Sequence, residues 1–367
     1  MSRLNELIQR LCPNGVEFIM LIDICKITIG EFVHKNKQTE EGKYPVFNGG
    51  KNHTGYYEEF NNDGNKVIIS ARGANAGYVN RVFTRYWAGN SCYSISPLND
   101  NYLNWLFLYY SLKNEEKKFM GNQQTGSIPA ISKKQIEQIK IPVPPLDVQN
   151  EIVRILDTFT SHAAELQAEL QARKEQYEYY RNKLLTFDKD DKNVKWVKLG
   201  EICNVVSGKN KEKNPIGTYP VYGSTGIIGY TENYSYCDKR ILVARVGANA
   251  GYTHIASGKY DVSDNTLVVD VKGHINFKYV YYSLVNLNLN KYARGGGQPL
   301  ITAGEIKTIQ IPIPPLSEQQ RIVSILNKFE ALVDNLTECL PAEIAAVQEQ
   351  YEYYRNKMLS FPKIKES

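Results

Sequence analysis

The sequence lacks the short motifs with which most enzymes hold phosphate, metal or a nucleophile. It contains no GxxxxGK[ST] or GxGxxG glycine loop, no HExxH zinc motif and no GxSxG turn. Its five histidines do not group, and none has an obvious nucleophile beside it. The sequence leaves spatial pairing of the scattered carboxylates open. We therefore expect a chain without catalytic residues of its own.

Cysteine is sparse and unpatterned. The six cysteines form no CxxC pair and no Cys/His cluster. This arrangement favours reduced thiols over a zinc site or a disulfide framework. We expect no metal.

Long hydrophobic runs are also missing. The most apolar window, Tyr102 to Leu112, is too short to span a bilayer. The opening segment, Met1 to Arg10, is polar and amphipathic and does not resemble a signal peptide. We expect a soluble, cytoplasmic protein with no membrane partner.

What the sequence does contain is a long internal repeat. The run IPVPPLDVQNEIVRILDTF at residues 141–159 returns as IPIPPLSEQQRIVSILNKF at 311–329, and KEQYEYYRNKLLTF at 174–187 returns as QEQYEYYRNKMLSF at 348–361. Ahead of the first copy lie KYPVFN, ARGANAGY and YYSL, and between the two copies TYPVYG, ARVGANAGY and YYSL follow in the same order. The order of the matches indicates a duplicated chain.

Each copy of the long repeat predicts an extended helix. After Pro145 the apolar residues alternate in steps of four and three, which is a heptad seam with Arg173 as its only charged member. A stripe this narrow needs a partner, and the other copy is the nearest one. The residues expected to pack are Ile152, Leu156, Phe159, Leu166, Leu170, Tyr177, Tyr180, Leu184, Ile322, Leu326, Phe329, Val333, Tyr351, Tyr354 and Met358.

The second copy carries one extra step of four near Pro341. An insertion of four keeps an apolar stripe nearly on its face. Because proline breaks the hydrogen bonding of a helix interior, we expect the second helix to kink or restart there. A short helix with Leu4, Leu7, Ile8 and Leu11 on one face opens the chain and is expected to dock on the C-terminal helix.

The fold class that follows is α+β: two duplicated α/β domains separated by two long antiparallel coiled-coil helices, with a pseudo-two-fold relation. The predicted segments are 1–140, 141–187, 188–310 and 311–367. Within the first domain we expect strands at 18–24, 44–47 and 66–70 and a helix at 102–119.

The loops of both domains carry Arg, Lys, Asn, Gln and His among glycines. Arginine pairs bidentately with guanine, and Asn or Gln with adenine, while lysine holds phosphates. The net charge of +5 permits such a role without requiring it. The GANAGY pair is itself expected to be a structural turn that aims Arg72 and Arg245 outward. The candidate DNA-binding residues are Lys51, His53, Arg72, Asn75, Arg81, Arg85, Gln123, Gln124, Lys209, Lys211, Lys239, Arg240, Arg245, Asn249, Arg294 and Gln298.

The duplicated IPxPPLxxQxxIVxIL run followed by a long heptad helix resembles the repeated region of the specificity subunit of type I restriction-modification systems. The resemblance covers nearly the whole chain. It implies two target-recognition domains, each reading one half of a bipartite double-stranded DNA target, with the helices as a spacer. It also implies a non-catalytic subunit joined by two methyltransferase subunits and by restriction subunits. S-adenosylmethionine, ATP and magnesium would belong to those partners, and this chain would have no cofactor of its own.

Two other interpretations stay open at this point. One is a protein scaffold, with two modules on a coiled coil that recruit proteins without DNA specificity. The other is a stand-alone DNA enzyme, which the missing motifs disfavour. Competition binding with nonspecific duplex separates the scaffold from a DNA reader, and cleavage or methyl transfer by the purified chain would reveal an enzyme.

Overall fold

The computed structural model describes residues 2–121, 129–209 and 214–364, and the side chains of residue 2 and of residues 333–339 lie outside that description. The chain divides into two compact units: unit 1 is Met1–Gln167 with Ala342–Ser367, and unit 2 is Ala168–Pro341. Each unit therefore contains a globular part, the beginning of one long helix and the end of the other. This division cuts across the helical segments predicted from the sequence.

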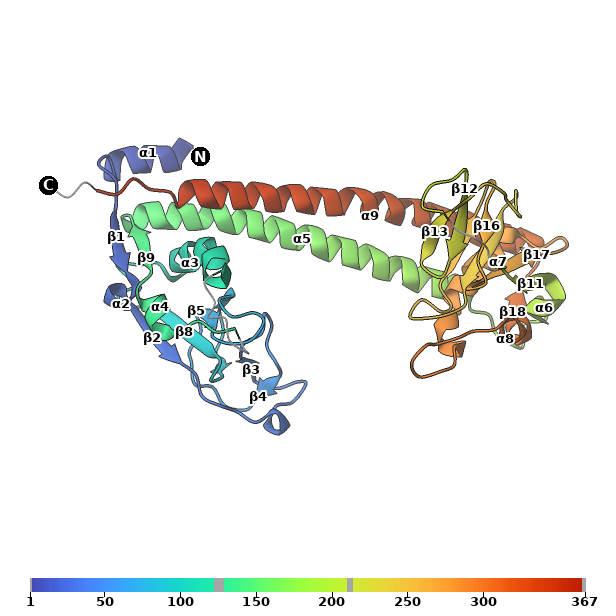
Figure 1. The fold of residues 1–367 in the computed structure, drawn as a ribbon, viewed down its shortest axis with the longest axis horizontal. Helices are drawn as coiled ribbons and strands as arrows, with labels where there is room; N and C mark the ends of the chain where they lie inside the picture. The colour runs from blue at the N-terminus through green and yellow to red at the C-terminus, as the bar shows by residue number, and fades with distance from the viewer. Residues whose placement is uncertain (1, 122–128, 210–213, 365–367) are drawn as a thin grey trace. The chain divides into compact units, whose positions relative to one another are not determined.

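Unit 1 contains a four-stranded antiparallel sheet in the order β2-β8-β5-β6 and a three-stranded sheet in the order β4-β3-β7 (Figure 1). A third, two-stranded pairing joins β1 to β9. Its strands are β1 (Glu17–Met20), β2 (Cys25–Ile29), β3 (Tyr44–Phe47), β4 (Tyr56–Tyr57), β5 (Lys66–Ser70), β6 (Val79–Val82), β7 (Trp87–Ala88), β8 (Cys92–Pro97) and β9 (Lys140–Val143). Its short helices are α1 (Ser2–Leu11), α2 (Leu21–Ile24), η1 (Lys35–Lys37), α3 (Trp105–Gly121) and α4 (Lys133–Glu137).

Unit 2 repeats this topology strand for strand. Its sheets run β11-β17-β14-β15 and β13-β12-β16, and β10 pairs with β18. The strands are β10 (Lys195–Lys198), β11 (Cys203–Ser207), β12 (Tyr219–Gly223), β13 (Gly226–Thr231), β14 (Arg240–Ala244), β15 (Thr253–Ala256), β16 (Asp261–Val262), β17 (Thr266–Val271) and β18 (Gln310–Ile313). The helices are α6 (Leu199–Ile202), α7 (Phe277–Asn286), η2 (Leu289–Tyr292) and α8 (Ala303–Thr308). The predicted duplication is confirmed.

The two long helices are α5 (Leu146–Leu185) and α9 (Leu316–Met358). Within unit 1, the first part of α5 and the last part of α9 run side by side in opposite directions (Figure 1). Along α5 every predicted seam residue is buried or half-buried, and only the charged member, Arg173, is exposed. The burial pattern along α5 matches the predicted apolar seam. Val333 lies among the side chains that are not described.

The predicted end of one strand was wrong, and of the kink or restart expected at Pro341 the restart is not found. The expected strand 18–24 ends at Met20, and residues 21–24 form the helical turn α2, because the chain bends where Leu21 N donates to Ile139 O at 2.9 Å. Helix α9 also continues through Pro341 without a restart. The residues around this proline, Leu340 and Ala342 to Ala346, are mostly strong helix formers and compensate for the lost hydrogen bond.

The predicted docking of the N-terminal helix is confirmed inside unit 1. Leu4 is 1% exposed and shares a core cluster with Met358 and Leu359 at the end of α9. The segment that follows α1 also contacts the segment that follows α9, because Val16 N donates to Pro362 O at 2.9 Å.

Candidate nucleic-acid interface

The repeated GANAGY segment forms the same turn in both units. In unit 1 it links β5 to β6, and Gly77 N closes the loop by donating to Ser70 O at 2.8 Å. In unit 2, Gly251 N donates to Ala244 O at the same distance. Gly77 and Gly251 have φ of 87° and 89°, a region that favours glycine. The prediction of a structural turn is confirmed.

The two arginines that precede this turn are not equivalent. Ala71 N donates to Ser91 O, and the matching bond in unit 2 runs from Arg245 N to Asn265 O. The partner of Arg245 in the duplication is thus the buried Ala71, and the exposed Arg72 corresponds to Val246. Because successive residues of an extended chain face opposite sides, one position of offset reverses the direction of the side chain. The expectation that both arginines point outward is wrong for Arg245.

Arg245 is half-buried and turned toward its own domain. Its Nη1 lies 3.3 Å from Asp264 O and 3.5 Å from Ser207 Oγ. Its Nε is buried without a hydrogen-bond partner among residues 2–121, 129–209 and 214–364. Arg245 therefore supports the fold of unit 2 at the base of the turn.

In unit 1 a second loop packs on this turn. Ser70 Oγ donates to Gly50 O at 3.1 Å, and Asn80 Nδ2 donates to Lys51 O at 3.2 Å. Gly49 lies so close that a Cβ there would sit 2.2 Å from Arg72 O. The loop 48–55 and the turn 71–78 therefore form one surface. It gathers the exposed Lys51 and Arg72 beside Asn75.

Unit 2 builds the corresponding surface with neutral groups. Asn249 Nδ2 donates to Ser224 O at 3.2 Å, and Ser224 Oγ donates to Asn265 O at 2.7 Å. The loop after β12 is thereby fixed to the GANAGY turn, as in unit 1. The same frame therefore carries different side chains in the two units.

Four predicted arginines are held by carboxylates. Arg85 pairs with Asp63 at 3.2 Å, and Arg294 with Glu305 at 3.1 Å. Arg240 pairs with Asp238 at 2.8 Å and also with Asp270. The hydrogen bond from Arg240 holds the pKa of Asp238 below its usual range. Arg81 pairs with Asp157 at 2.8 Å. For these residues, binding DNA would compete with ion pairs already made.

The remaining candidates are distributed as follows. Lys209, Lys239 and Gln298 are exposed in unit 2. His53 is exposed and lies with its ring centroid 4.8 Å from that of Tyr56. Gln123, Gln124 and Lys211 lie outside the described residues. A DNA contact by any candidate stays a prediction.

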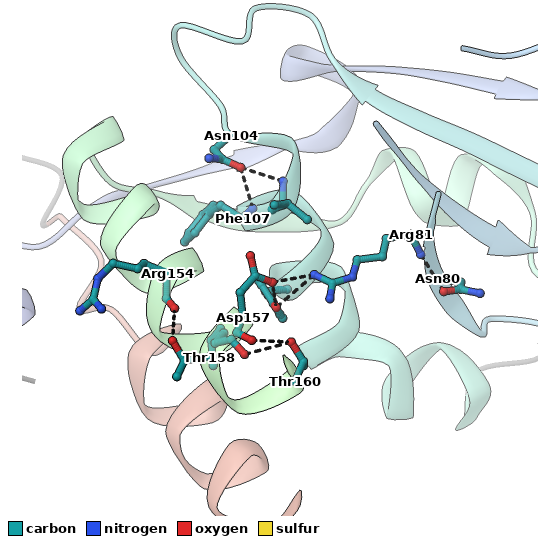
Figure 2. A network of polar contacts seen from close by, with 11 residues as sticks. Asn80, Arg81, Asn104, Phe107, Arg154, Asp157, Thr158 and Thr160 are labelled. Atoms are coloured by element: carbon teal, nitrogen blue, oxygen red, sulfur yellow. Dashed lines mark hydrogen bonds and ion pairs between the residues drawn. The ribbon is translucent and has the colours of Figure 1, made fainter. Parts of the chain in front are cut away.

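Sequence reasoning missed a polar cluster that joins strand β6 to helices α3 and α5 in unit 1. Arg81 Nη1 donates to Asp157 Oδ1 at 2.8 Å (Figure 2). Tyr110 Oη donates to the same oxygen at 2.5 Å. Burial, and then the hydrogen bond to this carboxylate, raise the pKa of Tyr110. The tyrosine thus stays protonated and remains a donor. Tyr110 belongs to the repeated YYSL segment, but no pattern in the neighbouring sequence indicates Asp157 as its partner.

Sequence reasoning also missed two equivalent glutamines, Gln149 and Gln319, each of which joins a globular part to its long helix. In unit 1 the carboxamide of Gln149 accepts from Asn104 N at 2.8 Å and donates to Pro144 O at 2.7 Å. In unit 2, Gln319 accepts from Asn276 N at 2.9 Å and donates to Pro314 O at 2.8 Å. Both glutamines are buried. The signal was present, since they are the Q of the repeated IPxPPLxxQ run.

Two classes of site are not found in the part of the chain that the structure describes. No three His, Cys, Asp or Glu side chains gather there in a way that could hold a metal ion. Among the described helices, none combines the length and the apolar character needed to cross a membrane.

A family model described as "Type I restriction modification DNA specificity domain" matches residues 13–176 and again residues 191–346. A putative type I restriction enzyme specificity subunit of Haemophilus influenzae is 32% identical over 366 residues, covering 89% of this chain and 90% of its own. The EcoR124I/EcoR124II specificity subunit of Escherichia coli is 33% identical, covering 73% and 74%.

Among solved structures, the S subunit of a type I restriction-modification system from M. genitalium has the same fold. The TM-score is 0.63 at 20% sequence identity, over 96% of this chain and 98% of the other. With two matches of the specificity-domain model in one chain, each centred on one of the duplicated domains, the chain belongs to the family of type I restriction-modification DNA specificity proteins.

Proposed function

We propose that the chain is the sequence-specific DNA-binding subunit of a type I restriction-modification complex. Each recognition domain reads one half of a bipartite target in double-stranded DNA, and α5 and α9 set the distance between the halves. The observation that carries the proposal is the duplicated recognition frame: the same strand orders and the same GANAGY turn, with different side chains on the two surfaces.

The chain acts without catalysis of its own in this proposal. Two methyltransferase subunits dock on the helices and domain faces, and restriction subunits complete the nuclease. S-adenosylmethionine, ATP and magnesium are bound by those partners. The complex works in the cytoplasm, where the DNA lies.

Methylation mapping tests the proposal. The chain is expressed with its methyltransferase subunit in cells that lack other modification systems, and the genome is sequenced for methylated bases. The expected result is a split motif with one fixed gap. Replacing residues 1–140 by another such domain then changes one half only. A stable complex that modifies no DNA would contradict the proposal and favour a protein scaffold.

A further inference from the structure

An ion pair joins strand β6, in the four-stranded sheet of unit 1, directly to helix α5. Arg81, on β6, contacts Asp157 of the helix, with Nη1 2.8 Å from Oδ1 (Figure 2). The same nitrogen lies 3.1 Å from Tyr110 Oη on α3. Since Tyr110 also donates to Asp157, one carboxylate oxygen joins a strand and two helices. A charge-assisted pair of this geometry is among the stronger polar contacts of a protein.

The surroundings of Arg81 commit it to this position. Its side chain is only 20% exposed. The guanidinium carbon lies 4.9 Å from the ring centroid of Tyr109 and 5.3 Å from that of Phe83. A guanidinium packed among aromatic rings and bonded to a carboxylate has few other rotamers open to it.

The Arg81–Asp157 ion pair follows closely, in the sequence, on the GANAGY turn at residues 71–78. Residues 71–78 are followed by Val79, the first residue of β6. Val79 N donates to Glu116 Oε2 at 2.7 Å, and Val79 O accepts from Lys113 Nζ at 2.9 Å. Two residues later Arg81 meets Asp157. The exit of the turn is thus bound both to α3 and to α5.

Among the described residues of unit 2, no corresponding ion pair joins strand β15 to helix α9. Asn327 of α9 holds the place of Asp157, and Ile255 of β15 holds the place of Arg81. The cation comes instead from helix α7: Lys278 Nζ donates to Asn327 Oδ1 at 2.7 Å and lies 3.2 Å from Glu330 Oε2. Tyr282 Oη donates to the same two acceptors at 2.8 Å and 2.6 Å. These contacts join a helix to a helix and leave the strand out.

We infer that Arg81 and Asp157 are a positioning pair that sets the angle of the first recognition surface on its spacer helix, and through it the gap length that the protein accepts. The inference rests on the proposed function. Adding one base pair to the gap moves a half-site by about 3.4 Å and turns it by about 35°. Only a surface held at a fixed angle to the spacer rejects that change. Arg81 then acts through the spacer and not by reading a base.

The test is methylation mapping of the full chain with its methyltransferase subunit, for the wild type and for Asp157→Asn. The variant should keep the bases of both half-sites and methylate targets with a gap one base pair longer or shorter. We expect about a tenfold rise at those targets, which corresponds to about 1.4 kcal/mol of lost discrimination. Asp157→Glu, which keeps a carboxylate, should lie closer to the wild type.

Two matched controls are available in the chain. Asp63→Asn breaks the exposed Arg85 ion pair in unit 1 by the same chemical change, and Glu330→Gln breaks the helix-to-helix contact of unit 2. Neither removes a tie between a strand and a spacer helix, so neither should widen the gap. The exchange variant, Arg81→Asp with Asp157→Arg, should restore a narrow gap. Thermal unfolding of each variant reports stability separately.

The outcomes separate the possible roles. A wild-type chain that methylates no split motif overturns the proposed function, whatever the variants do. An unchanged gap in Asp157→Asn overturns the positioning pair and leaves the proposed function standing. A relaxed base in the first half-site would show that Arg81 reads DNA. Loss of methylation that the exchange variant does not restore, with a lowered unfolding temperature, would show a purely structural pair.

Discussion

The ring of Phe159 stacks on the ring of Tyr354, with centroids 5.6 Å apart and planes inclined by 23°. Phe159 belongs to the first part of α5 and Tyr354 to the last part of α9. Unit 2 repeats the contact with the roles exchanged: Tyr180 of α5 stacks on Phe329 of α9, at 5.1 Å and 21°. Each aromatic seam pair therefore takes its phenylalanine from one copy of the repeat and its tyrosine from the other.

Truncating either phenylalanine should destabilise one unit selectively. A fully buried Phe→Ala change costs about 3–5 kcal/mol, and because Phe159 is half-buried we expect about 2 kcal/mol for Phe159→Ala. Urea unfolding followed by hydrogen exchange should show the loss in residues of unit 1. Phe329→Ala is the matched variant and should shift unit 2 instead. If either variant lowered protection from hydrogen exchange equally in both units, the two aromatic contacts would not be independent.

Arg72 and Arg245 should respond differently to truncation. Arg72→Ala removes an exposed cation from the recognition surface, so the slope of log K against log salt for DNA should become shallower by about 0.9, with unchanged stability. Arg245→Ala removes the contacts with Asp264 and Ser207 and should lower the unfolding free energy by about 1 kcal/mol. Salt titrations of duplex binding together with urea unfolding check both. If Arg245→Ala alone changed the salt slope, the assignment of the two arginines would be reversed.

His254 should make unit 2 less stable in mild acid. Burial lowers the pKa of this imidazole, which lies between the rings of Tyr222 and Tyr252, and neither ring nitrogen has a hydrogen-bond partner within the described residues. The unfolded chain therefore takes up the proton first, near its ordinary pKa of about 6.5. Stability is fully present above that pH and is lost as the pH falls toward the lowered folded value.

His254→Phe keeps an aromatic ring and removes the titration. Its unfolding free energy should depend less on pH between 7 and 5 than that of the wild type. His274→Asn, which alters an exposed imidazole of the same unit, is the control and should leave the wild-type slope in place. A slope unaffected by His254→Phe would assign the acid sensitivity to other groups.

The cysteines should differ sharply in reactivity. Burial raises the pKa of Cys25, Cys92 and Cys203 to about 12, while Cys237 is exposed. Since the thiolate is the reactive form, an alkylating reagent at pH 8 should modify Cys237 in the folded protein. These three thiols, and the buried Cys12, should react only after unfolding. Peptide mapping by mass spectrometry locates the label and separates it from Cys339, whose side chain lies outside the description. Rapid labelling of Cys92 would show that the sheet of unit 1 opens readily.

The sequence by itself determined the duplicated plan. The two copies of the long repeat predicted α5 and α9, and the alternation of four and three predicted which side chains are buried along them. Strands 44–47 and 66–70 also followed from local pattern and match β3 and β5 residue for residue. These features depend on periodicity and turn chemistry, which are properties of residues close together in the sequence.

Only the tertiary structure decided how the individual side chains are used. Arg72 and Arg245 look equivalent in the sequence, yet the hydrogen-bond register turns one outward and the other inward, because facing in an extended chain alternates with each residue. Arg81 looked like one more loop cation until folding brought it to Asp157, a residue 76 positions away. The partner of a charge is set by packing over such distances, and no local pattern carries that information.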